Sequence, residues 1–492
     1  MMTSDWTPEG LYTPIPEAPI AGKRTTMMKN TQMAAILARH RFAAAAIALA
    51  VCALWAGGGM SAQQSSSDNF PITPVRLVAG ASGQGPTEAA SARALPVATA
   101  AAIRARHQIH QNPELGNREF KTAELVAAHL RGLGLEVKTG VAHTGVVGIL
   151  RGARPGKTVA LRADMDALPV FEETPFAFKS TARTTYNGQD VPVSHACGHD
   201  IHVAVMMGVA SMLAPTRDTL AGNVMFIFQP AEEAPPQGEE GGSMLMLKEG
   251  IFKDLRPDVI FGLHSKPEWE VGTIAYTSGP TNATTGGFRA LLKGKSSHAA
   301  SPQLSVDPVV MAAQAVLAFQ TIRSRNLPPL EPSVITVAQI HGGIRDNIIP
   351  EDVRLEGTVR TFSDEAQNVV ERRMREILDG VARGAGGSYE LEYRQTTPVN
   401  ISNPDLVERM VPTLQRVLGK EHIVKASPVM ASDDFGRFAK EVPGMFLGLG
   451  VVKPGTTSGT NHTSNFLADD AAIPVGMQAI AAMVTDYLSS ER

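Results

Sequence analysis

From about Val97 onwards, apolar residues recur at the spacings of helices and buried strands. The stretch AAIRARHQIHQNPELGNREFKTAELVAAHLRGLG holds two helical patterns, which are separated at Asn112-Pro113 and end at Gly134. Short apolar runs follow in VVGIL, TVALRAD, NVMFIFQP and DVIFGLH, and helical patterns such as IHVAVMMGVASML lie between them. Buried strands that alternate with helices predict an α/β domain with a mostly parallel sheet.

Polar residues follow several of these strands, in the sequences ALRADMD, FQPAEE and FGLH. In open α/β sheets, ligands bind beyond the carboxyl ends of the strands. We therefore expect a functional site at that edge of the sheet.

Between about Asn282 and Thr397 the pattern changes. Strand-like FRALLKG leads to a helix, VDPVVMAAQAVLAFQTIRSR, and then to the strand-like stretches SVITVAQIHGG and VRLEGTVRTF. A second helix, EAQNVVERRMREILDGVARGAGG, and the strand SYELEYRQT complete a β-α-β-β-α-β order, which predicts a small ferredoxin-like unit. The apolar run GMFLGLG and a helix around PVGMQAIAAMVTDYLSS then resume the first domain. We predict one α/β domain over 97–281 and 398–492, interrupted by an inserted lid domain over 282–397.

The first 96 residues have a different composition. A basic stretch precedes the apolar run FAAAAIALAVCALW (Phe42 to Trp55), and the small residues AGGGMSAQQ follow it, which is the pattern of a secretory signal peptide within 1–62. The run is shorter than the roughly 20 apolar residues of a membrane-spanning helix. Residues 1–26 resemble neither a signal nor a domain, so translation that starts at Met27 or Met28 is an alternative. The Ser/Gln/Pro/Gly-rich residues 63–96 predict a disordered linker.

We therefore expect an exported protein, periplasmic or secreted, with no stable membrane span after signal cleavage. The alternative is an uncleaved membrane anchor. Cys52 would leave with the signal peptide, so that Cys197 would be the one thiol of the mature chain and no internal disulfide could form.

Overall composition is that of an ordinary globular protein, with 43% apolar and 19% charged residues. The formal net charge is -3 and only 5% of the residues are aromatic. A nucleic-acid partner is therefore not expected, because a basic phosphate-binding patch and stacking side chains are both poorly supplied.

The sequence SHACGHDIH places Cys197 and His199 two residues apart, just before a helical pattern. Thiolate and imidazole are good ligands for zinc and similar divalent metals. The alternative is a buried cysteine beside surface histidines. We favour a metal site, because three histidines and a cysteine fall within eight residues of a chain that has 13 histidines in all.

The sequence FQPAEE ends in Glu232 and Glu233, which the apolar strand NVMFIFQP delivers to the edge of the sheet. One carboxylate can ligate a metal while its neighbour acts as general base on a metal-activated water. The pair Glu239-Glu240 has no such strand before it and is predicted to be solvated.

Two further histidines have similar positions: His264 ends the strand VIFGLH, and His462 lies in TNHTSNF shortly before the last helix. Either alone is more often structural, but with the earlier groups they could complete one or two metal sites. Asp164 and Asp166 close the strand TVALRAD. We expect them to support the metal ligands, since a ligating histidine usually gives its other ring nitrogen to a carboxylate or carbonyl.

The motifs together resemble the aminoacylase/carboxypeptidase-type metallopeptidase family, and within it the branch that contains hippurate hydrolases and auxin-conjugate amidohydrolases. The resemblance runs from about residue 97 to the C-terminus through RHQIHQNPELGNREFKT, LRADMDALPV, SHACGHDIH, QPAEE, FGLH, SSHAASP, DNIIP, GTVRTF and NHTSNF. It implies a two-domain fold and a co-catalytic pair of divalent ions, for which Zn, Mn, Co or Ni would all suit the ligands. It implies Glu232 as general base and, as metal ligands, Cys197, His199, Glu233, His264 and His462.

The resemblance also implies substrate contacts in the lid. His298, in SSHAASP, would contact the substrate carbonyl or its developing oxyanion, often from the lid of a partner subunit, and Asn347 would hold polar groups of the substrate. A homodimer through the lid domain is implied as well. Without the resemblance, each of these two side chains is better explained as a turn residue that caps local backbone.

The expected function is hydrolysis of the amide bond of N-acyl amino acids or short peptides. A dipeptidase or carboxypeptidase of the same family and a catalytically silent metal-binding homologue are the alternatives. A serine hydrolase is disfavoured, because no GxSxG elbow follows a predicted strand.

Overall fold

The computed structural model describes residues 86–490. The expected signal peptide and most of the expected linker lie outside the described residues. One part of the linker prediction is wrong, because helix α2 (Pro86–Gln111) already begins at Pro86. The helix extends this far because Leu95 and Ala98 pack into the main core, where they are 5% and 4% exposed.

The larger domain is built on an eight-stranded sheet with the order β1-β2-β6-β3-β7-β18-β8-β17. In chain order, its strands are β1 (Glu136–Val141), β2 (Gly145–Arg151), β3 (Arg154–Asp164), β6 (Ala221–Gln229), β7 (Val259–Glu270), β8 (Ile274–Tyr276), β17 (Ile423–Lys425) and β18 (Gly444–Val452). The four central strands β6, β3, β7 and β18 are parallel to one another. The predicted mostly parallel sheet is thus confirmed, with antiparallel strands added towards its edges.

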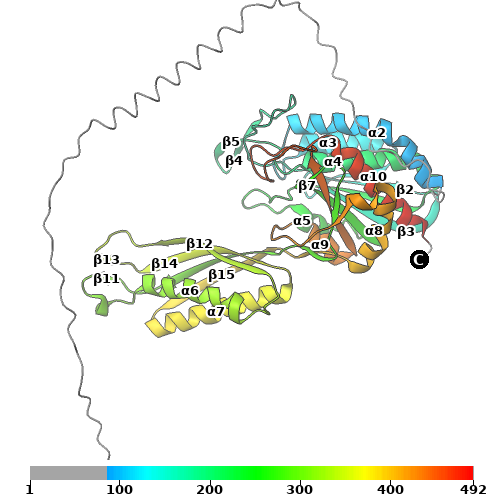
Figure 1. Cartoon of the computed structure of the whole chain (residues 1–492). Coiled ribbons are helices and arrows are strands. Elements are labelled where there is room, and N and C mark those ends of the chain that lie inside the picture. The colour runs from blue at the N-terminus through cyan, green and yellow to red at the C-terminus, as the bar shows by residue number, and fades with distance from the viewer. Residues whose placement is uncertain (1–85, 491–492) are drawn as a thin grey trace, which may run out of the picture. The chain divides into compact units, whose positions relative to one another are not determined.

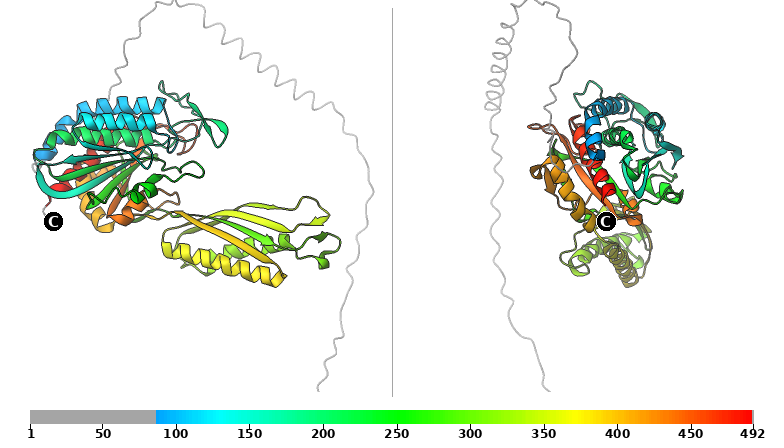
Figure 2. Two further views of the ribbon diagram at one scale, coloured as in Figure 1. Left: turned by 180° about the vertical axis from the view of Figure 1, so that it is seen from behind. Right: turned by 90° about the vertical axis from the view of Figure 1, so that its right-hand side faces the viewer.

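Helices cover both faces of this sheet (Figures 1 and 2). One face is packed by α2, α3 (Phe120–Gly132), α4 (His199–Leu213), α8 (Pro404–Leu418) and α10 (Ala472–Ser489), and the other by the short helices α5 (Gly242–Lys248) and α9 (Phe435–Glu441). The period of two along a strand sorts the side chains between the faces. In β6, Phe226 and Phe228 enter the first core, whereas Met225 and Ile227 enter the second.

The inserted domain has the predicted β-α-β-β-α-β order. Its elements are β10 (Thr285–Lys293), α6 (Pro308–Arg325), β12 (Ser333–Gly342), β14 (Asp352–Thr361), α7 (Asp364–Ala385) and β15 (Ser388–Thr397). The strands form an antiparallel sheet in the order β12-β14-β10-β15, and both helices pack on it around a separate core (Figure 1). The ferredoxin-like prediction is confirmed.

Short elements complete the fold. The connections to the inserted domain pair as β9 (Gly279–Asn282) and β16 (Asn400–Ser402), while β4 (Arg183–Tyr186) pairs with β5 (Gln189–Pro192) and β11 (Ser297–His298) with β13 (Ile348–Ile349). The described part of the chain also has the 3-10 turns η2 (Ala214–Thr216), η3 (Pro302–Leu304) and η4 (Lys420–His422). Within residues 86–490, no helix combines the length and the apolarity that a bilayer crossing requires.

Candidate metal centre

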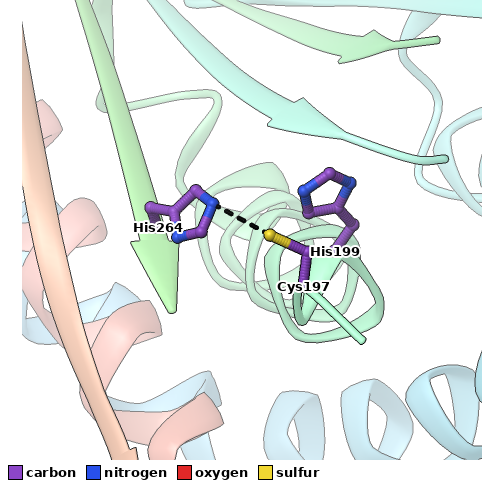
Figure 3. Close-up of side chains that lie close together, drawn as sticks. All are labelled: Cys197, His199 and His264. Carbon is purple, nitrogen blue, oxygen red and sulfur yellow. Dashed lines mark hydrogen bonds between the residues drawn. The ribbon is translucent and has the colours of Figure 1, made fainter. Parts of the chain in front are cut away.

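Cys197 and His199 lie on a sharp turn that begins α4. Gly198 between them has a φ of 83°, a left-handed conformation that glycine adopts at little cost. A Cβ atom at this position would lie 2.3 Å from the Oγ of Ser265. Glycine therefore lets the turn press against β7, and this contact brings the two side chains towards His264 (Figure 3).

His264 lies beside Cys197 and His199. Its Nε2 atom lies 3.4 Å from the Sγ atom of Cys197, as the dashed line in Figure 3 marks. The expectation that His264 ends its strand is wrong, because β7 continues to Glu270. The strand is longer because its second half still pairs with β18, whose Gly450 lies opposite Lys266.

Glu232 and Glu233 follow β6 directly and face the same point. The Nε2 atom of His199 lies 3.9 Å from Oε2 of Glu232 and 3.9 Å from Oε1 of Glu233. The same Glu233 oxygen lies 2.9 Å from Nε2 of His462. His462 is held there by its backbone N–H, which donates to the carbonyl of Ala196 at 2.8 Å.

The structure thus brings together all five predicted ligands, Cys197, His199, Glu233, His264 and His462, which we call the metal centre. Triads of these donors, such as Cys197 with His199 and His264 or Cys197 with Glu233 and His462, have their ligand atoms within 4.8 Å of one another. Glu232 lies beside them, in a triad with His199 and Glu233.

The donors fit a divalent cation. The Nε2 atom of the fully buried His199 has no hydrogen-bond partner among the described residues, and the carboxylate oxygens that face it lie 3.8 to 3.9 Å away. Buried polar groups are normally hydrogen-bonded, so this orphaned nitrogen suits metal coordination. A thiolate, three imidazoles and a carboxylate are a donor set that zinc and similar ions accept.

Electrostatics favour a positive charge at the same place. Burial would lower the pKa of His199, but the surrounding carboxylates, Asp164 first among them, raise it to about 10. Burial and the neighbouring glutamates raise the pKa of the Cys197 thiol. A thiolate at Cys197 therefore needs a cation close by, and a bound divalent ion would supply that charge.

The two aspartates at the end of β3 face different histidines: Asp164 is the last residue of the strand, and Asp166 lies two residues beyond it. Asp166 is next to the metal centre, since its Oδ1 lies 3.3 Å from Nδ1 of His199 and its Oδ2 accepts from the backbone N–H of Glu233 at 2.9 Å. Asp164 instead faces His202, with 2.5 Å between Oδ1 and Nδ1. His202 contacts Ser265 with its other nitrogen at 2.6 Å, so Asp164 reaches the centre only indirectly or across 3.8 Å to His199.

A buried charge network that sequence reasoning missed lies behind Glu232. Arg162 is fully buried, and its guanidinium lies 2.6 Å from Asp164, 2.9 Å from Asp434 and 3.3 Å from Asp433. The backbone N–H of Asp434 donates to Glu232 at 3.4 Å. The available signal was an arginine within the apolar strand TVALRAD, since a buried charge needs a partner.

Burial and the neighbouring carboxylates shift the pKa of Glu232. Burial raises the pKa of Glu232 well above its ordinary value, and Asp433 and Glu233 add to that shift. Asp433 itself has a pKa raised to about 6, again mainly by burial. The carboxylates repel one another, and a neighbouring positive charge would lower the pKa of Glu232 again.

His298 and Asn347 lie together in the inserted domain. His298 is in β11, opposite Ile348 of β13, and the backbone N–H of Ala299 donates to the carbonyl of Asn347 at 3.0 Å. Both side chains are exposed. Within the described part of the chain, neither has a hydrogen bond or ion pair to the metal centre, so their predicted substrate contacts stay a prediction.

Comparison with known proteins agrees with this geometry. The sequence profile of peptidase family M20/M25/M40 matches residues 160–486. Thermostable carboxypeptidase 2 of Saccharolobus solfataricus is 36% identical over 389 residues, which cover 78% of this chain and 95% of that protein. IAA-amino acid hydrolase ILR1-like 2 of Arabidopsis thaliana is 35% identical over 393 residues, which cover 79% of this chain and 85% of that protein.

A solved structure supports the same assignment. The crystal structure of the Bacillus subtilis YXEP protein, a dinuclear metal binding peptidase from the M20 family, aligns with a TM-score of 0.67 and 29% identity. The alignment covers 80% of this chain and 99% of that one. The predicted family resemblance is thus confirmed. The chain belongs to peptidase family M20/M25/M40 and is a metal-dependent enzyme of the amidohydrolase/carboxypeptidase type.

Proposed function

We propose that this enzyme hydrolyses the amide bond of N-acyl amino acids or short peptides, with two divalent ions held by the metal centre. The relatives whose names describe an IAA-amino acid hydrolase and a carboxypeptidase support this substrate class. The observation on which the proposal depends is the convergence of five donors, among them His199, whose buried Nε2 atom has no protein hydrogen-bond partner.

The donors that would hold the ions form overlapping triads. Cys197, His199 and His264 form one triad, and Cys197, Glu233 and His462 form another, so Cys197 is common to both. When bound, the ions would lower the pKa of water towards neutrality and polarise the substrate carbonyl.

Glu232 would move the proton. It is not needed in either of those two triads, yet its Oε2 lies 3.9 Å from His199. As a carboxylate beside the metal centre, it can accept the proton of the attacking water and then donate it to the leaving nitrogen. The backbone N–H of Asp434 orients the carboxylate for both transfers.

In the lid, His298 would stabilise the oxyanion of the substrate and Asn347 would hold its polar groups. Their proximity in the β11/β13 pair supports a shared role. A catalytically silent homologue would have no need of Glu232 beside a complete donor set.

The deciding experiment compares Glu232→Gln with Glu240→Gln, a control in the exposed pair further along the same loop, where Glu240 is 54% exposed and contacts Lys248. N-acetyl and N-benzoyl amino acids and dipeptides form the substrate panel. We expect Glu232→Gln to retain its metal and lose nearly all turnover, while Glu240→Gln remains active. Normal turnover in Glu232→Gln would refute the proposed base.

Metal dependence is tested separately. A chelator should abolish hydrolysis, and Mn, Co, Zn or Ni should restore it. Elemental analysis of wild type against a Cys197→Ser, His199→Gln double variant should show loss of the bound ions. Equal metal content in the two proteins would refute the metal centre.

We also propose that the chain is exported and that it dimerises through the lid. The basic stretch and apolar run before Trp55 support export. The edge position of β12 and the 72% exposure of Leu317 on α6 support an interface. N-terminal sequencing of the protein from cell fractions tests export, and light scattering of wild type against Leu317→Glu tests dimerisation.

A further inference from the structure

The loop that presents Glu232 and Glu233 is bracketed by two alanines with unusual backbone conformations. Ala231 has a φ of 48° and Ala234 a φ of 112°. Positive φ is rare for residues other than glycine, because Cβ crowds the backbone. Such conformations persist where the surrounding structure holds them in place. The groups that contact this loop therefore determine its shape.

The side chain of Glu119 supports the first half of this loop. The side chain is completely buried, and its Oε1 accepts a hydrogen bond from the backbone N–H of Ala231 at 2.8 Å. Its Oε2 accepts from the hydroxyl of Thr144 at 2.5 Å, and Thr144 is itself only 3% exposed. The carboxyl group therefore joins the turn between β1 and β2 to the strained residue just before Glu232.

The side chain of Glu119 does not cap helix α3. It occupies the N-cap position of α3, yet its side chain makes no capping hydrogen bond. Glu114 caps the helix instead, because its carboxylate accepts from the backbone N–H groups of Lys121 and Thr122 and from the Thr122 hydroxyl, at 2.9 to 3.1 Å. The burial of a carboxyl group is unfavourable in itself, so its benefit must lie at Ala231 and Thr144.

The rest of the loop is held by other contacts. A Cβ atom at Gly116 would lie 2.9 Å from the carbonyl oxygen of Ala234, so this segment lies directly against the loop. Asp166 accepts from the backbone N–H of Glu233, but Asp166 also faces His199. Glu119 differs from Asp166 in that it holds the loop without facing a donor of the metal centre.

We propose that Glu119 is a positioning residue, which holds Ala231 in its left-handed conformation and thereby fixes the directions of Glu232 and Glu233. The inference rests on the proposed function, since Glu119 acts through the base and a metal ligand. A shift of about 1 Å in a catalytic group costs on the order of 10²-fold in rate. Removal of the Glu119 carboxyl group is expected to allow such a shift, because the backbone of Ala231 can then relax towards negative φ.

The test compares Glu119→Ala with Glu114→Ala, a matched control that removes the true cap of the same helix. At saturating metal, Glu119→Ala should lower kcat by roughly 10²-fold, with KM changed by less than about threefold. Chelator competition should show metal affinity reduced by roughly tenfold or more, as for other residues that support metal ligands. Glu114→Ala should lower the melting temperature but keep both kcat and metal affinity.

Glu119→Gln provides the rescue. Its amide oxygen can still accept from Ala231, and the Thr144 hydroxyl can turn to accept from the amide nitrogen. We expect it to retain most of the wild-type kcat. Loss of kcat in Glu119→Gln as large as in Glu119→Ala would overturn a role based on hydrogen bonding.

Glu232→Gln separates the two levels of the proposal. Full turnover in that variant would mean that the proposed function has failed. An inactive Glu232→Gln together with wild-type kcat and metal affinity in Glu119→Ala would overturn the positioning role alone, as would an equal loss of kcat in Glu114→Ala. If Glu119→Ala does not fold, Thr144→Val decides. A reduced kcat at constant KM supports the role of Glu119, and a wild-type kcat refutes it.

Discussion

The buried Arg162 provides a quantitative test of the electrostatics behind the active site. Arg162→Met keeps an unbranched apolar side chain but removes the guanidinium that lies within 3.3 Å of Asp164, Asp433 and Asp434. All three carboxyl groups come from segments that lie beside Glu232 or the metal centre. The substitution therefore leaves several acidic groups in a buried environment without their cation.

The expected loss in free energy of unfolding depends on the burial of the charged groups more than on the distance between them. Removal of one partner from a buried ion pair costs about 3–5 kcal/mol, because a charge remains uncompensated. The control pair Arg151–Glu136 has nearly the same separation, 2.7 Å against 2.6 Å, but its side chains are 50% and 60% exposed. An exposed pair contributes at most about 1 kcal/mol. Arg162→Met should therefore lower the free energy of unfolding several times more than Arg151→Met.

The free-energy loss in Arg162→Met is expected to depend on pH, and the sign of this dependence follows from the pKa values of the buried carboxyl groups. Burial would raise the pKa of Asp164, but Arg162 and the nearby histidines lower it well below its ordinary value in the wild type. That carboxylate therefore contributes stability above the pKa of the unfolded chain, and the contribution is lost as the pH falls. Without Arg162, the folded-state pKa values of the buried carboxyl groups rise instead. The free-energy loss in Arg162→Met should then be larger at pH 8 than at pH 5.

Urea unfolding followed by circular dichroism at several pH values measures this loss. Wild type, Arg162→Met and Arg151→Met are compared at equal metal saturation. A loss in Arg162→Met no larger than in Arg151→Met would refute the reasoning from burial. A loss of the same size at pH 5 and pH 8 would refute the assignment of the effect to carboxyl groups.

Three further predictions concern other parts of the larger domain. Burial would lower the pKa of His110, but Asp200 and Glu172 raise it to about 9, so its stabilising effect is complete below the unfolded pKa of about 6.5 and is lost as the pH rises through 9. His110→Gln should therefore flatten the stability profile between pH 6.5 and 9 in thermal melts, and an unchanged slope would contradict this. Gly198→Ala should abolish specific metal retention in elemental analysis, because its Cβ would clash with Ser265; full metal content would contradict the close approach. Metal removal should lower the melting temperature, since a ligand that binds only the folded state stabilises it by about 2.7 kcal/mol at 100 times its Kd; identical melts with and without chelator would contradict tight binding.

Much of the fold could be predicted because periodicity records which face of each element is buried. The alternation in β6 separates Phe226 from Ile227 by face, and the order of elements in the inserted domain matches the pattern in the chain. Helix α2 was predicted to start too late, because its first turns are rich in small and polar residues, and Leu95 alone gives little sign of the core that it joins.

The candidate site could be predicted only in part. The metal donors could be identified from residue type, because thiol, imidazole and paired carboxylates are unusual side chains at the ends of apolar strands. Their supporting groups could not be identified in this way. Asp164 and Asp166 look alike in the sequence, but Asp164 is the last residue of β3 and faces His202, whereas Asp166 lies beyond the strand and faces His199.

The sequence by itself determined the elements, the two-domain order and the chemical kinds of the ligands, since these depend on local periodicity and on the identity of single residues. Only the tertiary structure decided which buried charges meet. Arg162 and Asp434 are 272 residues apart, and Glu119 and Ala231 are 112 apart. Such pairs depend on sheet register and on the approach of distant loops, and neither is recorded in the spacing of residues along one segment.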